Sequence, residues 1–126
     1  MIGNKYLQTL YEYEDEDTSL NQLLEFLKCK DNSFIDSLYK PINLKECNNR
    51  EIKYLTIIAA LIDYFLQIYC IEVPNWLRDE KLMFDRPYFY PRKRISDFEK
   101  VKLLYTNPAP FRNRNVYFDL NGIQRI

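Results

Sequence analysis

The sequence predicts a mainly α-helical, single-domain protein that spans residues 1–126. The chain is 47% hydrophobic and 16% aromatic, which supplies enough apolar side chain for one buried core. It contains only 2 glycines, whereas strand-rich folds usually need more for their tight turns. A nearly unbroken apolar segment at 51–69 is longer than a normal strand. We therefore expect a helical bundle around a long central helix at 51–69, with a short C-terminal extended or hairpin element.

The first two helices are expected at 6–13 and after an acidic run at 14–17. Residues 6–13 place their apolar side chains close to one helical face. The four adjacent acids repel one another, so a break in the helix is expected there. Ser19 and Gln22 fit a capping box in front of the leucines at 20–27. The acidic run then lies beside the positive end of the helix dipole.

A third short helix is expected between Asn32 and Pro41. Asn32 or Ser33 caps its start, and Pro41 marks its end. A loop at 42–49 follows, and one of the two asparagines that end this loop caps the central helix.

The central helix is apolar except for one narrow polar stripe. With Ala60, the stripe consists of four polar side chains at helical spacing: Lys53, Thr56, Asp63 and Gln67. A helix with so little polar surface is buried on most sides. Two interpretations of the stripe remain open. It is the solvent-facing edge of a core helix, or Asp63 and Gln67 form a polar notch that receives an arginine from a partner or from the basic tail.

The chain after the central helix combines a short helix with an extended segment. Pro74 suits the first turn of that helix, which Trp76 and Leu77 are expected to pack against the core. Prolines on both sides of 88–90 exclude a helix at 86–94, so this segment is irregular or extended.

The last long helix is expected to start at a second capping box, formed by Ser96 and Glu99, and to end near Thr106. Four apolar side chains are predicted to form its inner face: Phe98, Val101, Leu104 and Tyr105. In the C-terminal tail we expect a strand at 116–118 followed by a turn at 121–122. The alternative is that the tail ends in a short turn of helix.

Residues for most catalytic and metal chemistry are missing. The chain has no histidine, which is the commonest general base and metal ligand, and two glycines cannot form a nucleotide-binding loop. Its three cysteines lack zinc spacing and a C-x-x-C pair. We therefore expect no metal, no cofactor and no catalytic residues. The enzymatic alternative is a carboxylate site that combines Asp63 with Glu72 or Asp79.

The sequence also predicts a cytoplasmic protein without membrane contact. The N-terminal segment 1–14 has no apolar signal core. The longest apolar run, at 57–62, is far shorter than the ~20 residues that cross a bilayer. An odd number of cysteines without disulfide spacing is typical of a reducing compartment.

Charge is divided unevenly along the chain. Residues 1–80 carry 8 basic and 14 acidic side chains, a net charge of −6, whereas residues 81–126 carry 10 and 4, a net charge of +6. The two parts neutralise each other within the fold or between the subunits of a homo-oligomer, or the basic part faces an acidic partner.

The most unusual segment is NPAPFRNRNVYF at 107–118. Its prolines are expected to hold an extended backbone, which lets Phe111 insert into a protein partner while Arg112 and Arg114 bind carboxylates. The predicted partner-binding site comprises Phe111, Arg112, Arg114, Asn115, Asp63 and Trp76. The alternative is a rigid corner that docks the tail strand, with its arginines paired to Asp63, to Asp79 or to the acidic N-terminal half. Our leading functional hypothesis is a non-catalytic interaction protein.

A nucleic-acid-associated regulator is the second functional hypothesis. Arg92, Lys93 and Arg94 follow Tyr88 and Tyr90 closely. Basic side chains contact phosphates and aromatic rings stack on bases, so this mixture is typical of nucleic-acid surfaces. Three charges are few, however, and the sequence pI near 6.3 is low for a dedicated nucleic-acid binder.

Several segments together resemble a family of small uncharacterised bacterial proteins. That family has a helical A-A-L-x-D stretch, a V-P-x-W step and a closing P-x-x-F-x-x-R-N-[IV]-[FY] segment. The resemblance covers roughly residues 55 to 120 and rests on Ala59, Ala60, Leu61, Asp63, Val73, Pro74, Trp76, Phe111, Arg114, Asn115 and Val116. Members are suspected of belonging to toxin–antitoxin or regulatory gene pairs. The resemblance therefore implies an antitoxin-like or regulatory role through binding of another protein.

Overall fold

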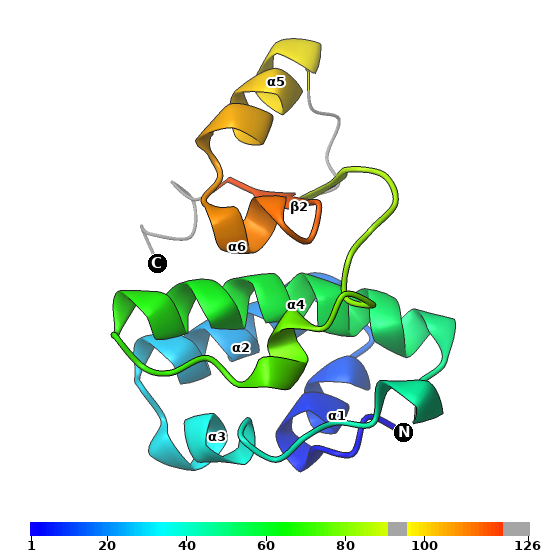
Figure 1. Cartoon of the computed structure of the whole chain (residues 1–126), viewed down its shortest axis with the longest axis vertical. Coiled ribbons are helices and arrows are strands. Elements are labelled where there is room, and N and C mark those ends of the chain that lie inside the picture. Colours follow the sequence, from blue (N-terminus) through cyan, green and yellow to red (C-terminus); the bar gives the residue numbers. More distant parts are fainter. Residues whose placement is uncertain (91–95, 120–126) are drawn as a thin grey trace.

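The computed structural model of the chain describes residues 1–90 and 96–119. The prediction of a mainly α fold is confirmed, and helices account for most of the ordered elements (Figure 1). In chain order the elements are α1 (Lys5–Tyr11), α2 (Glu16–Lys28), α3 (Asn32–Ser37), the 3₁₀ helix η1 (Leu44–Glu46), α4 (Asn49–Ile68), the 3₁₀ helix η2 (Asn75–Arg78), β1 (Tyr88–Tyr90), α5 (Asp97–Thr106), α6 (Ala109–Arg112) and β2 (Val116–Phe118).

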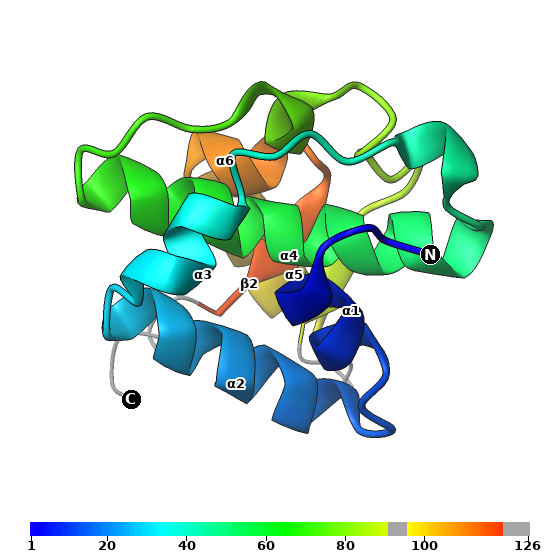
Figure 2. The same ribbon diagram turned by 90° about the horizontal axis from the view of Figure 1, so that it is seen from below.

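The long helix α4 runs through the middle of the molecule. Helices α1, α2 and α3 lie on one side of it, whereas α6 and β2 lie on the opposite side (Figures 1 and 2). Leu23 and Leu27 of α2 and Leu55, Ile58 and Leu61 of α4 are completely buried. The main core therefore lies between α4 and the N-terminal helices, and a second packed layer covers the other side of α4.

The acidic run caps α2 and forms its first turn. Asp15 accepts a hydrogen bond from the backbone N–H of Asp17, and Glu16 is the first helical residue. Acidic side chains are favourable there because they face the positive end of the helix dipole. The predicted capping box at Ser19 is wrong, because Ser19 is buried inside α2 and its hydroxyl donates to the carbonyl of Leu10 at 2.7 Å.

The caps of the next two helices also come from short polar side chains. Asp31 caps α3, one residue before the earlier of the two predicted caps. Asn48 caps α4 by accepting from the N–H of Glu51 at 2.8 Å, while the Glu51 carboxylate accepts from the N–H of Asn48 at 2.9 Å. This capping box fixes the start of the central helix, and the prediction at 51–69 is confirmed.

The polar stripe of α4 is exposed only at its two ends. Lys53 and Gln67 are exposed, whereas Thr56, Ala60 and Asp63 are buried. Thr56 satisfies its hydroxyl within the helix by donating to the carbonyl of Ile52. The interpretation of the stripe as a solvent-facing edge is therefore wrong for the middle of α4, where Thr56, Ala60 and Asp63 are buried.

The two short strands form a parallel pair. Tyr88 lies opposite Val116, and Tyr90 lies opposite Phe118. The strand predicted at 116–118 is thus confirmed, and its partner within the described residues is β1. Parallel neighbours need a crossover connection, which here contains α5 and α6. The turn predicted at 121–122 lies outside the described residues.

The proline-rich segment before β2 is helical. Pro108 precedes the single turn of α6, and Pro110 lies within its first turn. A proline at the start of a helix loses no hydrogen bond, since the first N–H groups have no partner inside the helix. The prediction of an extended backbone is therefore confirmed for Pro108 and wrong for Pro110. Earlier in the chain, Pro74 precedes η2, where Trp76 and Leu77 are buried as predicted.

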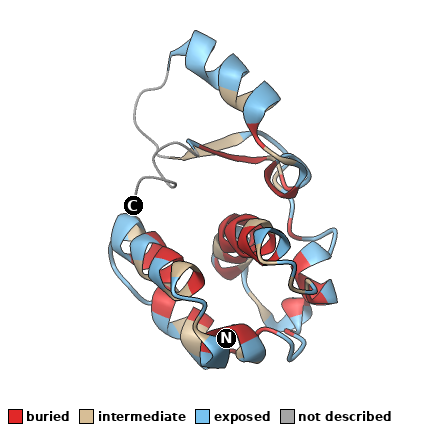
Figure 3. Cartoon of the chain, turned by 90° about the vertical axis from the view of Figure 1, so that its left-hand side faces the viewer, coloured by how far each residue is buried: buried red, intermediate tan, exposed pale blue. Residues whose placement is uncertain are grey.

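Helix α5 stands away from the core. It begins after Ser96, which accepts from the N–H of Glu99, and it ends at Thr106 as predicted. Figure 3 shows α5 mostly in the colour of exposed residues, at the end of the molecule beyond the strands, whereas α4 is mostly buried. No residue of α5 is buried. The inner face predicted for this helix is wrong for Phe98, Val101 and Tyr105, which are exposed, whereas Leu104 is half-buried.

No helix in the described part of the chain is both long enough and apolar enough to span a bilayer.

Candidate functional site: an internal charge cluster and an exposed helix face

Asp63 lies in the middle of a cluster of polar side chains on the C-terminal side of α4. Its Oδ2 accepts from Nη2 of Arg114 at 2.8 Å and from Nε of Arg78 at 3.1 Å. Its Oδ1 accepts from Nε2 of Gln67 at 2.7 Å and from Nη2 of Arg78 at 3.2 Å. Asp63 is therefore the arginine-receiving notch that the sequence left open, and arginines of the same chain fill it.

The electrostatics of the cluster favour its charged form. Burial alone would raise the pKa of Asp63, but the hydrogen bonds from Arg78, Gln67 and Arg114 outweigh burial and lower it. The hydrogen bond that Arg78 donates to Asp63 raises the pKa of the Arg78 guanidinium. Burial lowers the pKa of Arg114, although Asp63 opposes this effect. Asp63 is consequently an ionised acceptor at neutral pH and a poor proton carrier for catalysis.

Arg114 is a buried structural residue. Its side chain is almost fully buried, and it donates to the carbonyl of Pro110 through Nη1 and to the carbonyl of Leu77 through Nη2, both at 2.7 Å. Its Nε is buried without a hydrogen-bond partner among the residues that the structure describes. With Asp63, these contacts join α4, η2 and α6 at one point. The alternative of a corner that docks the tail strand is thus what the structure shows for Arg114.

A cleft of about 500 Å³ opens beside this cluster. Asp63 and Asp79 both line it, whereas Glu72 lines a separate pocket. Asp79 is exposed and accepts from the N–H of Lys81. In the ranges 1–90 and 96–119, no group of three or more acidic or cysteine side chains is placed to hold a metal ion.

Two more residues of the predicted partner-binding site belong to the core. Phe111 is completely buried, and its ring packs at centroid distances of 5.2 Å from Tyr64 and 5.5 Å from Phe118. Trp76 is buried, and its Nε1 donates to the carbonyl of Leu38 at 2.6 Å. The structure therefore places Phe111, Trp76, Asp63 and Arg114 in contacts within the chain, and their binding of a partner stays a prediction.

The remaining two residues of that predicted site lie nearer the surface. Arg112 is exposed in the last turn of α6. Asn115 is half-buried, has a positive φ of 60° and donates through Nδ2 to the carbonyl of Phe84 at 3.2 Å. Asparagine tolerates this left-handed conformation better than most residues, so Asn115 serves the turn into β2.

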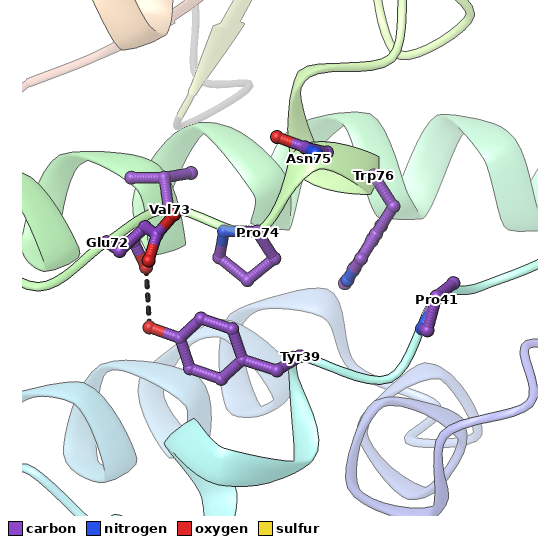
Figure 4. A pocket seen from close by; sticks show the side chains of 7 residues that line it. All are labelled: Tyr39, Pro41, Glu72, Val73, Pro74, Asn75 and Trp76. Atoms are coloured by element: carbon purple, nitrogen blue, oxygen red, sulfur yellow. Dashed lines mark hydrogen bonds between the residues drawn. The ribbon is translucent and has the colours of Figure 1, made fainter.

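The side chain of Trp76 also borders a small surface pocket of about 280 Å³ (Figure 4). Opposite it, the hydroxyl of Tyr39 donates to the backbone carbonyl of Glu72, and Pro41 and Pro74 complete the apolar wall. The polar atoms of both aromatic side chains are thus bonded to the backbone. These two hydrogen bonds join the segment after α3 to the segment after α4.

The two tyrosines of the nucleic-acid hypothesis contact the acidic start of α2. The hydroxyl of Tyr88 donates to Oε1 of Glu16 at 3.0 Å, and the hydroxyl of Tyr90 donates to Oδ1 of Asp17. Burial, aided by Asp17, raises the pKa of Tyr90. Both rings are half-buried, and their polar ends are directed at carboxylates. The basic residues 92–94 of that hypothesis lie outside the described residues.

The outward side of α5 is an apolar surface that sequence patterns assigned to the core. Phe98 is 80% exposed, Val101 is 50% exposed and Tyr105 is 81% exposed. We call these three side chains the α5 face. Leu103, on the opposite side of the helix, and Leu104, one turn after Val101, are half-buried. Because α5 has apolar residues on both sides, its periodicity alone could not show which side faces the protein.

Comparison of the chain with protein-family models, with curated proteins and with solved structures found no match.

Proposed function

We propose that this chain is a non-catalytic protein-interaction module of the bacterial cytosol, antitoxin-like or regulatory, and that the α5 face is its docking surface. The observation that carries the proposal is the exposure of Phe98, Val101 and Tyr105 on one side of one helix. Exposed single apolar residues are normal on a protein surface, but a group of them on one element is typical of an interaction site.

The side chains of the α5 face suit protein recognition. Phenylalanine and tyrosine bury large areas, and aromatic residues are enriched at the centre of protein interfaces. The other large exposed apolar side chains of the described chain are single residues on separate segments: Met1, Tyr13, Tyr39, Ile68 and Met83. The α5 face is therefore the one concentrated apolar surface that these residues offer.

The placement of α5 supports the same role. The helix lies at one end of the molecule, with β2 and α6 between it and α4 (Figure 1). The spacing of three and four residues aligns Phe98, Val101 and Tyr105 along the helix, as in helices that insert into a groove or pair with another helix. We therefore expect a partner that presents an apolar helix or groove.

The test is affinity purification of the tagged protein from its native host, followed by mass spectrometry and nucleic-acid quantification. Wild-type protein is compared with the double variant Phe98→Glu/Tyr105→Glu and with a control, Met83→Glu, which places the same charge at an exposed apolar site elsewhere. We expect one stoichiometric protein that the double variant loses and the control keeps. Circular dichroism establishes that each variant is folded.

Two outcomes would contradict the proposal. In one, the folded double variant keeps the same partner in the same amount. In the other, the eluate contains nucleic acid that is lost at high salt and on replacement of Arg92, Lys93 and Arg94 by alanine, which would favour the nucleic-acid hypothesis instead.

A further inference from the structure

We propose that the cleft beside Asp63 binds a small zwitterion with an apolar side chain, of the class of free α-amino acids. This site is separate from the α5 face and goes beyond the docking role proposed above. The cleft volume of about 500 Å³ lies within the range of pockets that hold small molecules. Three features of its lining support the proposal: excess positive charge in one part of the wall, two free carboxylates beside it and a set of apolar side chains.

One part of the cleft wall carries more positive than negative charge. Arg78 and Arg114 both line the cleft, and both are paired with the single carboxylate of Asp63. The Arg78 side chain is 55% exposed, and its Nη1 makes no hydrogen bond to any residue in the ranges 1–90 and 96–119. A ligand carboxylate can therefore bond to Nη1 without displacing Asp63, and hydrogen bonds between a guanidinium and a carboxylate are among the stronger ones in proteins.

The buried side of the same wall also lacks an acceptor. Arg114 is only 4% exposed, and its Nε has no hydrogen-bond partner among the described residues. A buried donor without an acceptor costs free energy, so an oxygen atom brought near this wall is favoured. This part of the cleft therefore suits the negatively charged end of a ligand.

Two carboxylates follow Arg78 directly in the chain. Asp79 and Glu80 line the cleft and are exposed, and neither forms an ion pair with a described residue. An ammonium group has three N–H donors, which carboxylates accept in charge-assisted hydrogen bonds. Because residues 78–80 are consecutive, the protein places opposite charges close together, as they are in the ammonium and carboxylate groups of an α-amino acid.

The remaining lining of the cleft is mainly apolar. Leu82 and Pro110 are buried, whereas Ala109 and Met83 are exposed. Burial of an apolar ligand side chain against these residues is favourable, and methionine adapts to side chains of different shape. An amino acid with an apolar side chain therefore fits this part of the cleft.

Other classes of ligand fit the charges less well. A phosphate or another multiply charged anion would lie beside the carboxylates of Asp79 and Glu80. A ligand with only positive charge would lie beside Arg78. Like charges brought together at a binding site are unfavourable, whereas a zwitterion presents the opposite charge to each group.

The first experiment is isothermal titration calorimetry of the full chain with L-leucine, L-methionine and L-phenylalanine. We expect at least one of them to bind with a Kd below about 1 mM. Its N-acetyl form, which lacks the ammonium group, and its amide, which lacks the carboxylate, should each bind at least about tenfold more weakly. The proposal would be overturned if none of the three amino acids binds at about 10 mM, or if both analogues bind as well as the amino acid.

The second experiment locates the ligand by matching each protein group to the ligand group that it contacts. Arg78→Gln should weaken binding of the amino acid at least about tenfold and leave binding of its amide unchanged. Asp79→Asn/Glu80→Gln should weaken binding of the amino acid and leave binding of its N-acetyl form unchanged. The matched controls are Lys81→Gln and Glu72→Gln, which remove exposed charges that do not line the cleft.

Nuclear magnetic resonance titration measures the weak binding of the analogues, and circular dichroism establishes that each variant is folded. If the folded cleft variants bind the amino acid as well as the controls do, the ligand does not occupy the cleft and the proposal fails. The α5 face takes no part in either experiment, so the proposed function does not depend on their outcome.

Discussion

Arg114 and Asp63 lie 51 positions apart in the sequence and are joined by a buried hydrogen-bonded ion pair at 2.8 Å. The pair connects the C-terminal segment to the central helix α4. Arg78 and Gln67 complete the hydrogen bonds of the carboxylate. Because the side chains of Arg114 and Asp63 are almost fully buried, removing Arg114 takes away the buried counter-charge of Asp63 and leaves only the more exposed Arg78 to pair with it.

Arg114→Ala should therefore lower the free energy of unfolding by about 3 kcal/mol, the lower end of the usual cost of breaking a buried ion pair, because Arg78 still pairs with Asp63. Arg112→Ala is the matched control, since Arg112 is exposed two residues away and should change stability by less than about 0.5 kcal/mol. Urea denaturation followed by circular dichroism measures both. Equal effects of the two substitutions would show that the pair does not hold the C-terminal segment in place.

Stability should fall at acid pH partly through Asp63. Its pKa is lower in the folded chain than in the unfolded chain, where carboxylates of this type titrate near about 3.9. The stabilisation from its ionised form is therefore complete above that value and is lost as the pH falls through the folded pKa. Denaturation measured from neutral pH to about pH 3 should show this loss. Asp79→Asn should retain it and Asp63→Asn should lack it; an identical acid profile for Asp63→Asn would argue against the assignment.

Two phenylalanines provide a matched comparison of core and surface. Phe111→Ala should cost about 3–5 kcal/mol, because it removes a completely buried ring between Tyr64 and Phe118. Phe98→Ala should change the stability of the monomer by no more than about 0.5 kcal/mol, since its ring is 80% exposed. Thermal denaturation at low protein concentration separates the two cases. A large loss from Phe98→Ala would mean that α5 packs against the protein through this ring.

Tyr54 should lose its proton at a higher pH than an exposed tyrosine does. Burial raises its pKa to about 12, although its hydrogen bond with Ser19 acts in the opposite direction. A tyrosine in the unfolded chain titrates near about 10, so the stabilisation from neutral Tyr54 is complete below that pH and is lost as the pH rises toward 12. Ultraviolet titration of Tyr54→Phe should lack one tyrosinate transition near pH 12. An unchanged high-pH transition would show that Tyr54 does not have this pKa.

The sequence contained enough local information for most helix positions. The capping pattern and the long apolar run located α4, and Ser96 located the start of α5. It placed the cap of α2 wrongly, because Ser19 and Asp15 are both good capping residues. The outcome was decided by the contact of Ser19 with Leu10, which belongs to a different helix.

The candidate site was harder to predict than the helices. The sequence identified Asp63 and Arg114 as unusual, but it could not show that they meet each other rather than a partner. Likewise, Phe98, Val101 and Tyr105 have the spacing of a core-facing stripe, and Leu103 on the opposite side is equally apolar. In the structure, α5 packs against β2 in a way that leaves Phe98, Val101 and Tyr105 exposed.

By itself, the sequence determined the helical character of the chain, the central position of α4 and the strand before the C-terminus. These features depend on hydrophobic periodicity, caps and prolines, which act within a few residues. The tertiary structure alone decided that the strands are parallel, that Arg114 is buried against Asp63 and that the aromatic side of α5 faces outward. Those features depend on contacts between residues far apart in the chain. The residues next to an apolar side chain in the sequence do not indicate which distant residues will cover it.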